Sequence, residues 1–279
     1  MSYTFGMPVR VYRLTSHDLT LTTLTGPTLD AVSLQLPEGI YTTCRTYDRN
    51  HILGLSAHLQ RLADSHAALS RMRPLEFAAI RSGLRTVIER EGLPAIRLRI
   101  TTPFDSEEVF IGVEPFQSFP AEYYTRGARG ATTHLGRETP KAKSTGFIAP
   151  SRAAKAETDP DVHEMLMVDD AGRILEGLSS NFFAVLNGTL YTAGEGVLEG
   201  VTRGVVLAEA PKMLPVSLTP IMVADLPHAV EAFITSSGRE VMPVRQIDDA
   251  VIGAGEPGPA TRELMARYRA HVMKDAELP

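Results

Sequence analysis

Alternating polar and apolar residues run through the first part of the chain, between positions 9 and 47, and this pattern constrains the fold more than any other feature. Residues 19 to 24 and 39 to 47 show the period of two that is typical of half-buried strands. Residues 56 to 70 and 75 to 91 then carry apolar side chains at helical spacing, with Ser56 as the expected N-cap of the first helix. Gly92 and Pro94 are expected to end the second helix.

Further short elements follow without a strict alternation of strand and helix, which predicts an α+β fold. Strands are expected at residues 96–101, 109–113, 164–168, 182–185, 189–192 and 232–235, and helices at 150–157 and 202–213. Residues 115–120 and 126–136 are rich in Pro, Gly and polar residues. We therefore expect a smaller N-terminal α/β domain (1–120), a linker (121–136) and a larger cofactor-binding domain (137–279).

The composition excludes several classes of protein. A formal net charge of -5 gives no basic footprint for nucleic acid, and no run of 18 apolar residues could span a membrane. Cys44 is the single cysteine, so there is no disulfide framework, and no histidines are spaced as a metal pair. The N-terminus lacks an apolar signal core, so we expect a cytoplasmic protein with no nucleic-acid, membrane or metal partner.

Lysine is scarce, which confines amine chemistry to few positions. Of five lysines, Lys143 lies upstream of the motifs described next, with Lys141 and Lys155 as competitors. A lysine amine can form an imine with a cofactor aldehyde and then move the α-proton of a substrate. A surface lysine is the commoner interpretation of any one of the three, and its position relative to the later motifs favours Lys143.

Residues 176 to 181 read E-G-L-S-S-N, a motif that presents a carboxylate at a turn. A carboxylate beside a pyridine nitrogen keeps that nitrogen protonated, so Glu176 is a candidate partner for a pyridoxal ring. Ser180 and Asn181 would brace the turn. The alternative is an ordinary turn residue at a strand start, because a hairpin-like turn at residues 171–172 comes just before it.

Two further turns could hold a phosphate. Residues 200 to 203, G-V-T-R, precede an apolar helical run, and a hydroxyl with backbone N–H groups at a helix N-terminus forms a phosphate seat. Residues 235 to 238, T-S-S-G, offer a second set of hydroxyls and amides, and Arg61 could neutralise the phosphate charge. The alternatives are a threonine N-cap, an ordinary turn and an unremarkable helix arginine.

A glycine pattern at residues 253 to 258 fits the dinucleotide loop G-x-G-x-x-G. Pro257 and Pro259 disturb the start of the helix that such a loop needs. Only about twenty residues follow, too few for a βαβ unit and its ribose-binding acid. The pattern is therefore rejected as a nucleotide site.

With these motifs in this order, the chain resembles class IV pyridoxal phosphate enzymes, the fold-type IV group. That group includes branched-chain and D-amino acid aminotransferases, (R)-amine transaminases and aminodeoxychorismate lyase. The resemblance covers roughly residues 38 to 265, through HLQRL (58–62), KST (143–145), HEMLMVDDAGRILEGLSSNFF (163–183), GVTRGVVL (200–207) and TSSGREVMPV (235–244). It implies a two-domain fold like that of D-amino acid aminotransferase, with pyridoxal 5′-phosphate between the domains, and a homodimer.

The resemblance also implies a role for each matching residue. Lys143 would carry the imine and move the proton, Glu176 would pair with the pyridine nitrogen, and Leu198 would pack against one ring face. The phosphate would be held by Arg61, Val201, Thr202, Ser237 and Gly238, and Gly200 would let the backbone approach closely.

The chain departs from the family where substrate is chosen. The usual opening hairpin with an Asp-x-Gly turn is not recognisable in residues 1 to 37. Tyr41 and Thr42 stand where many members have an aromatic residue and a glutamate, and Gly146 and Phe147 follow the lysine motif where an asparagine or tyrosine is common.

Three residues are candidates for substrate binding: Tyr41, Arg45 and Arg97. Strand alternation would place Arg45 on the same side as Tyr41, and a guanidinium suits bidentate recognition of a carboxylate. Salt bridges on the surface or between domains are an equal alternative for both arginines.

The sequence therefore predicts a pyridoxal phosphate-dependent aminotransferase. It would move an amino group between an amino acid, of the D-amino acid or branched-chain type, and a 2-keto acid through a Lys143 imine. A lyase like aminodeoxychorismate lyase and an (R)-amine transaminase are the alternatives, and keto-acid-dependent turnover separates the lyase from a transaminase. A non-catalytic scaffold would need neither Lys143 nor Glu176.

Overall fold

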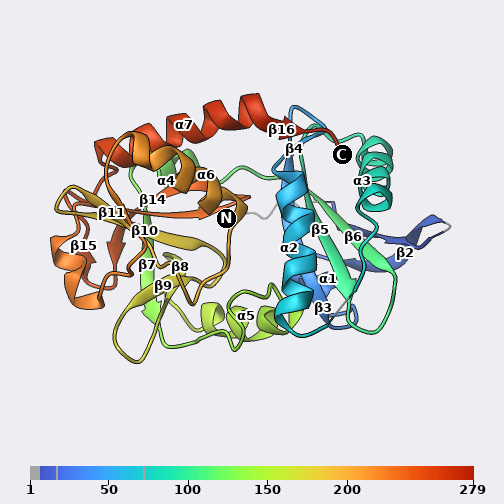
Figure 1. The fold of residues 1–279 in the computed structure, drawn as a ribbon, viewed down its shortest axis with the longest axis horizontal. Coiled ribbons are helices and arrows are strands. Elements are labelled where there is room, and N and C mark those ends of the chain that lie inside the picture. The colour runs from blue at the N-terminus through green and yellow to red at the C-terminus, as the bar shows by residue number, and fades with distance from the viewer. Residues whose placement is uncertain (1–6, 17, 72) are drawn as a thin grey trace. The chain divides into compact units, whose positions relative to one another are not determined.

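The structure is a computed structural model that describes residues 7–16, 18–71 and 73–279. The chain divides into two compact units (Figure 1). The first unit consists of Met1–Gln117, Ala142–Pro150 and Lys274–Pro279, and the second of Ser118–Lys141 and Ser151–Met273.

The chain thus returns to the first unit twice, whereas the sequence placed everything from residue 137 onward in one C-terminal domain. Hydrogen bonds explain the first return. The amide of Tyr41 donates to the carbonyl of Lys143 (2.9 Å), and the amide of Gly39 donates to Thr145 Oγ1 (3.0 Å). Residues 142–150 are therefore attached to a strand of the first unit although they lie far from it in sequence.

A seven-stranded antiparallel sheet forms the first unit, in the order β16-β4-β3-β5-β6-β1-β2. Its strands are β1 (Val9–Leu14), β2 (Leu19–Gly26), β3 (Gly39–Tyr47), β4 (His51–Leu53), β5 (Ile96–Pro103), β6 (Val109–Pro115) and β16 (Ala276–Glu277). Its helical elements are α1 (Leu29–Ser33), α2 (Leu55–Ala68), α3 (Phe77–Glu91) and the 3₁₀ turn η1 (Thr145–Phe147), which leads into α5 (Ile148–Ala156).

The two faces of this sheet are covered differently. Apolar residues of α2 and α3, such as Leu59 and Leu84, pack with Ile40 and Ile100 of the strands into one fully buried core. On the opposite face the short helix α1 covers only a smaller cluster around Phe110. Because side chains alternate along a strand, the remainder of that face carries the polar residues of β3 and β5.

The second unit contains a closed ring of six strands. Its strands pair in the order β12-β11-β10-β13-β14-β7-β8-β9, and β9 pairs again with β10, which closes the ring. The strands are β7 (Ala128–Thr133), β8 (Val162–Val168), β9 (Ile174–Gly177), β10 (Asn181–Leu186), β11 (Thr189–Tyr191), β12 (Val216–Ser217), β13 (Glu231–Ser236), β14 (Glu240–Ile247) and β15 (Ala250–Val251). Ring closure leaves few exposed strand edges in this unit.

Helices complete the second unit, and most of its buried apolar side chains come from the strands of the ring. They are α4 (Ala121–Thr125), α6 (Val201–Glu209), the 3₁₀ turns η2 (Ala210–Lys212) and η3 (Val223–His228), and α7 (Pro259–Asp275), drawn in red in Figure 1. At the start of α7, Glu231 accepts hydrogen bonds from the amides of Ala260 (3.0 Å) and Thr261 (2.7 Å).

The glycine pattern at residues 253 to 258 has a structural role here. Gly253 and Gly255 adopt positive φ angles of 55° and 76° in the turn before α7, where side chains other than glycine are strained. A Cβ at Gly258 would collide with the carboxylate of Glu231. The three glycines therefore serve the approach to α7.

Most of the expected elements are confirmed, with ends shifted by a few residues. The expected N-cap Ser56 is wrong, because α2 begins after Gly54, a residue in the left-handed region. Gly92 ends α3 in the left-handed conformation, as expected. The helix α1 was missed within the stretch expected to contain strands, and α7 was missed altogether.

None of the helices in the described ranges is long and apolar enough to cross a membrane. The same residues contain no cluster of three or more His, Cys, Asp or Glu side chains that could hold a metal ion.

Candidate active site

Lys143 is anchored by its backbone beside β3 in the first unit. Besides the bond from Tyr41 to its carbonyl, its amide donates to Ser65 Oγ (3.2 Å), and Ser144 forms a bridge with Ile40. Its Nζ lies 4.9 Å from the centroid of the Tyr41 ring. The backbone of Lys143 is therefore fixed on both sides, and its amine lies beside an aromatic face.

The Tyr41 ring also lies close to a second cation. The guanidinium carbon of Arg99 is 4.6 Å from the ring centroid. Arg99 is almost fully buried and is held by Asp30 (2.7 Å), Ser33 Oγ (2.8 Å) and Thr43 Oγ1 (3.2 Å). The helix α1, which the sequence did not predict, supplies two of these partners.

Arg61 is held by a buried threonine and a buried histidine. Its Nη2 donates to Thr42 Oγ1 (2.7 Å), and Thr42 Oγ1 lies 2.7 Å from His58 Nδ1. Burial lowers the pKa of His58 well below 6.5, and the charges of Arg61 and Lys143 lower it further. A neutral His58 can accept a hydrogen bond from the Thr42 hydroxyl, which leaves the threonine oxygen to accept one from Arg61.

The two arginines proposed for substrate lie opposite each other on β3 and β5. Arg45 pairs with Arg97 and Tyr41 with Thr101 in the strand register, so the shared face expected from alternation is confirmed. Arg97 forms an ion pair with Glu114 at 2.9 Å. The guanidinium of Arg45 lies 4.2 Å from the ring centroids of both Tyr47 and Phe116.

In the second unit, Glu176 is buried, and three neighbours fix its carboxylate. Its Oε2 accepts from Asn181 Nδ2 (3.0 Å) and from the amide of Leu198 (3.1 Å), and its Oε1 lies 3.2 Å from Arg137 Nε. Glu176 and Arg137 expose only 2% and 5% of their side chains. The Arg137 guanidinium therefore places a positive charge directly beside the buried carboxylate.

Asn181 connects the motif of residues 176–181 to the segment before α6. Its Nδ2 also donates to the carbonyl of Leu198 (2.8 Å). A Cβ at Gly200 would collide with Asn181 Oδ1. The absence of a side chain at Gly200 therefore lets the backbone pass close to Asn181.

The N-cap of α6 is Gly200, and Val201 and Thr202 occupy its first turn. Thr202 was considered as an N-cap, and it lies instead at the second helical position, with 2% exposure. The first amides of a helix have no carbonyl partner within the helix, so this turn offers N–H donors for an anion.

Four side chains close to these groups were not among the predicted site residues: Arg137, Arg203, Arg99 and His58. Arg203 ends the G-V-T-R motif and donates to the carbonyl of Ala193 (2.9 Å). Burial lowers the pKa of Arg203, while Glu199 and Glu176 act to raise it. The motifs G-V-T-R and HLQRL contained the signals for Arg203 and His58. Arg99 lies two positions after Arg97 on β5, so strand alternation places both on one face and could have indicated Arg99. Nothing in the local sequence indicates that Arg137 meets Glu176.

The residues of the second unit fit a pyridine ring with a phosphate. Glu176 offers a fixed carboxylate for a ring nitrogen. The hydroxyl of Thr235 is buried and has no hydrogen-bond partner among the residues described, and a Cβ at Gly238 would meet none of them within 4 Å. A buried donor of this kind is expected to be satisfied by a ligand or water.

Comparison with known proteins decides the family. The sequence model of the amino-transferase class IV family matches residues 39–247. The chain belongs to the class IV aminotransferase family. Pyridoxal 5′-phosphate is the cofactor of these enzymes, so the expected family, fold class and cofactor are confirmed.

Relatives within class IV carry more than one activity. A branched-chain-amino-acid aminotransferase of Pseudomonas aeruginosa is 28% identical over 258 residues, which cover 82% of each chain. A D-alanine aminotransferase of Bacillus licheniformis is 23% identical over 256 residues, covering 86% of this chain and 90% of the relative.

Solved structures share the fold. A branched-chain amino acid aminotransferase solved with pyridoxamine 5′-phosphate has a TM-score of 0.80 and 24% identity, over 95% of this chain and 94% of the other. The 4-amino-4-deoxychorismate lyase of Pseudomonas aeruginosa has a TM-score of 0.71 and 25% identity, over 83% of this chain and 90% of the other.

Proposed function

We propose that this class IV aminotransferase moves an amino group between an amino acid of the D-amino acid or branched-chain type and a 2-keto acid, with Lys143 as its reactive amine. The arrangement around Glu176 carries the proposal, because a buried carboxylate fixed by Arg137, Asn181 and Leu198 is suited to hold a proton on a pyridine nitrogen. Bound pyridoxal 5′-phosphate supplies an aldehyde and an electron-withdrawing ring.

Each predicted site residue has a distinct task in this proposal. Lys143 would hold the cofactor at its aldehyde, and its Nζ, once displaced by the substrate amine, would take up and return the proton of the substrate α-carbon. Glu176 would keep the ring nitrogen protonated, and Leu198 would pack against the ring. Arg61 and the turns at residues 200–202 and 237–238 hold the phosphate, with support from the Thr42 and His58 contacts to Arg61.

For the substrate, we propose that the face of β3 and β5 that carries Tyr41, Arg45 and Arg97 receives the carboxylate and side chain. Either arginine is a candidate for the carboxylate ligand. Arg97 forms an ion pair with Glu114, and the guanidinium of Arg45 lies against the rings of Tyr47 and Phe116.

The test is an absorbance spectrum of the protein loaded with pyridoxal 5′-phosphate, repeated after D-alanine, L-leucine and (R)-1-phenylethylamine are added separately. Conversion of the cofactor band by D-alanine or L-leucine, reversed by a 2-keto acid, is the expected result. Conversion by the aromatic amine alone would identify an (R)-amine transaminase instead. The aminotransferase proposal fails if no donor converts the band.

A lyase like aminodeoxychorismate lyase is the second candidate, and the similarity to the solved lyase of Pseudomonas aeruginosa favours it. Such an enzyme would turn over without a keto acid. Product formation from an amino-deoxychorismate-type substrate with no keto acid present is therefore the discriminating measurement.

We also propose that the chain is a homodimer, as the family resemblance implies, and that it is cytoplasmic, as expected from its N-terminal sequence. Its single cysteine, Cys44, is buried, and burial raises the pKa of its thiol to about 12, so no reactive thiol demands a particular redox compartment. Light scattering of the purified protein tests the dimer, and a monomer mass would contradict it.

A further inference from the structure

A second buried carboxylate lies in the second unit, separate from Glu176. Glu164 of β8 exposes only 2% of its side chain. Its Oε2 accepts from Ser179 Oγ (2.7 Å) and Ser180 Oγ (3.0 Å), and its Oε1 accepts from the amide of Met165 (3.1 Å). Glu164 therefore holds the two serines at the centre of the E-G-L-S-S-N motif.

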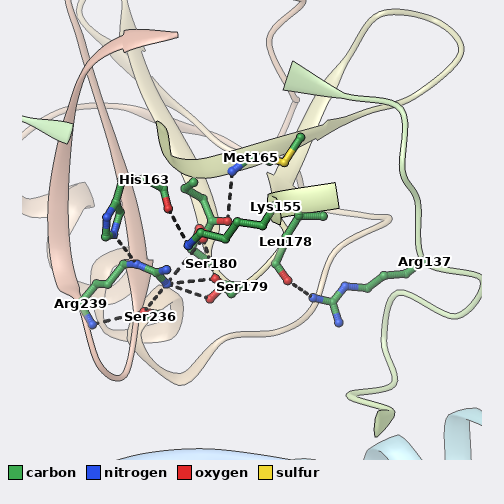
Figure 2. A network of polar contacts seen from close by, with 10 residues as sticks. Arg137, Lys155, His163, Met165, Leu178, Ser179, Ser180, Ser236 and Arg239 are labelled. Atoms are coloured by element: carbon green, nitrogen blue, oxygen red, sulfur yellow. Dashed lines mark hydrogen bonds and ion pairs between the residues drawn. The ribbon is translucent and has the colours of Figure 1, made fainter. Parts of the chain in front are cut away.

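Arg239, in the turn at residues 236–239, approaches Ser179. Its Nη1 lies 3.1 Å from Ser179 Oγ and 3.5 Å from Glu164 Oε2, and it also lies 3.4 Å from Ser236 Oγ. Figure 2 shows the end of the Arg239 side chain between the side chain of His163 and the serines Ser179 and Ser180. One guanidinium thus contacts the turn at residues 176–181, the turn at residues 236–239 and the acid behind them.

The other edge of the guanidinium is held by His163. Arg239 Nε donates to His163 Nε2 at 2.8 Å, and Phe119 and Tyr123 pack against the imidazole ring. Burial lowers the pKa of His163 to about 3, with further contributions from Arg239 and Lys155. His163 is therefore a neutral acceptor near pH 7, and it orients Arg239 without adding charge.

The backbone explains why these two turns need a connection. In the antiparallel pair of β10 and β13, Asn181 lies opposite Thr235, so β10 begins where β13 ends. The two turns therefore leave the same end of neighbouring strands, beyond their last shared hydrogen bonds. Gly177 allows the turn at residues 176–181 to pack closely against Glu164, because a Cβ at this position would collide with Ser180 Oγ and the Glu164 side chain.

We propose that Arg239 and Glu164 are positioning residues that clamp the turn at residues 176–181 to the turn at residues 236–239 and so set the phosphate-binding geometry of Ser237 and Gly238. This rests on the proposed function, in which those two residues hold the cofactor phosphate. These contacts require an arginine at position 239. Its planar guanidinium group presents several N–H donors in fixed directions, whereas the ammonium group of a lysine is one compact charge.

The test compares binding of pyridoxal 5′-phosphate and of pyridoxal, which lacks the phosphate, to the apoprotein. For Arg239→Lys we expect the Kd for pyridoxal 5′-phosphate to rise roughly tenfold or more, as for loss of one or two charge-assisted hydrogen bonds. The Kd for pyridoxal is expected to change less than about twofold, because the Glu176 carboxylate is fixed separately by Asn181, Leu198 and Arg137. Arg126→Gln, which removes an exposed arginine paired with Glu122, is the matched control.

A change at Arg239 alone disturbs its buried ion pair with Glu164 and could destabilise the fold, because it can leave a buried charge without its partner. Two further variants test the clamp without this effect. Ser236→Ala removes one contact of Arg239 without removing a charge, and Glu164→Gln/Arg239→Gln removes both charges together. Both are expected to weaken pyridoxal 5′-phosphate binding more than pyridoxal binding.

The clamp is refuted if Arg239→Lys and Ser236→Ala bind pyridoxal 5′-phosphate as tightly as the wild type, or if both ligands weaken by the same factor. The second result would indicate a general structural role. If the wild-type protein binds neither ligand, the proposed function itself fails, and this outcome is distinct from the other two.

Discussion

At the scale of single residues, both reactive groups are fixed through their surroundings. The Lys143 backbone is tied to Tyr41 and Ser65, and the Glu176 carboxylate is tied to Asn181, Leu198 and Arg137. Pre-oriented groups lose little freedom when a ligand binds, which is what a catalytic amine and a ring-nitrogen partner require.

Lys143→Ala tests the central assignment. We expect the cofactor absorbance band to lose its lysine-linked form and amine transfer to fall by about 10²–10⁴-fold, the usual contribution of a positioned proton-transfer group. Lys141→Ala is the matched control, since it removes the neighbouring lysine, and it should retain both signals. Unchanged spectra and turnover in Lys143→Ala would remove Lys143 from the mechanism.

Thr42→Val tests the support of Arg61. Valine keeps the shape of threonine but removes the oxygen that accepts from Arg61 and lies against His58. We expect the Kd for pyridoxal 5′-phosphate to rise about tenfold, corresponding to one lost hydrogen bond to a charged group. Thr42→Ser, which keeps the hydroxyl, should restore tight binding in the same titration, and equal Kd values for valine and serine would argue against this support.

At the scale of elements, histidines buried in the neutral form make stability depend on pH. His163 on β8 has a pKa of about 3 in the folded protein, against about 6.5 when unfolded. Between these values the unfolded chain binds a proton that the folded chain does not, so acid favours unfolding. The contribution of His163 is fully present above about pH 6.5 and is lost as the pH falls toward 3.

His163→Gln isolates this effect. Between pH 6 and 4, the free energy of unfolding should fall more steeply in the wild type than in the variant. The difference between the two slopes should be up to about 1.4 kcal/mol per pH unit. Urea unfolding at several pH values measures the two slopes. Parallel slopes would mean that His163 takes up its proton in the folded state as readily as in the unfolded one.

The start of α7 gives a second prediction at this scale. Glu231 caps the helix through the amides of Ala260 and Thr261 and through Thr261 Oγ1 (2.6 Å). Glu231→Ala leaves buried donors without their acceptor and should lower the free energy of unfolding by about 2–3 kcal/mol. Glu263→Ala, an exposed acid within α7 paired with Arg267, should change it by less than about 0.5 kcal/mol in the same chemical denaturation series.

Elements with a clear period were predictable from sequence, and those held by distant partners were not. The alternation of β3 and the capped pattern of α3 identified both elements. The five-residue helix α1 is too short to show a period, and the buried residues of α7, such as Leu264 and Tyr268, stand among charged neighbours. The contacts of Arg137 with Glu176 and of Arg239 with Glu164 join segments far apart in the chain, and no local pattern encodes them.

At the scale of the whole molecule, the cofactor should contribute to stability as well as to chemistry. A ligand present at about 100 times its Kd stabilises the folded state by about 2.7 kcal/mol. Removing pyridoxal 5′-phosphate by dialysis should therefore lower the melting temperature by about 5–10 °C. Calorimetry of the holo and apo forms measures this shift, which Glu176→Gln should reduce, and identical melting curves with and without cofactor would contradict specific binding.

The closure of the six-strand ring bears on how the second unit moves. Within the described chain, β9 and β10 are joined at one register pair, and that pair is Glu176 with Asn181. A sheet opens most readily where its ladder is shortest, because fewest hydrogen bonds break there. Glu176, the carboxylate proposed to pair with the ring nitrogen, thus lies at the weakest strand junction of the six-strand ring. A ligand that binds to Glu176 would also stabilise this junction between β9 and β10. In the protein without cofactor, the backbone amides near the β9–β10 junction should be the first in the ring to exchange their hydrogens with solvent. Bound cofactor should slow the exchange of these amides more than that of any others in the ring.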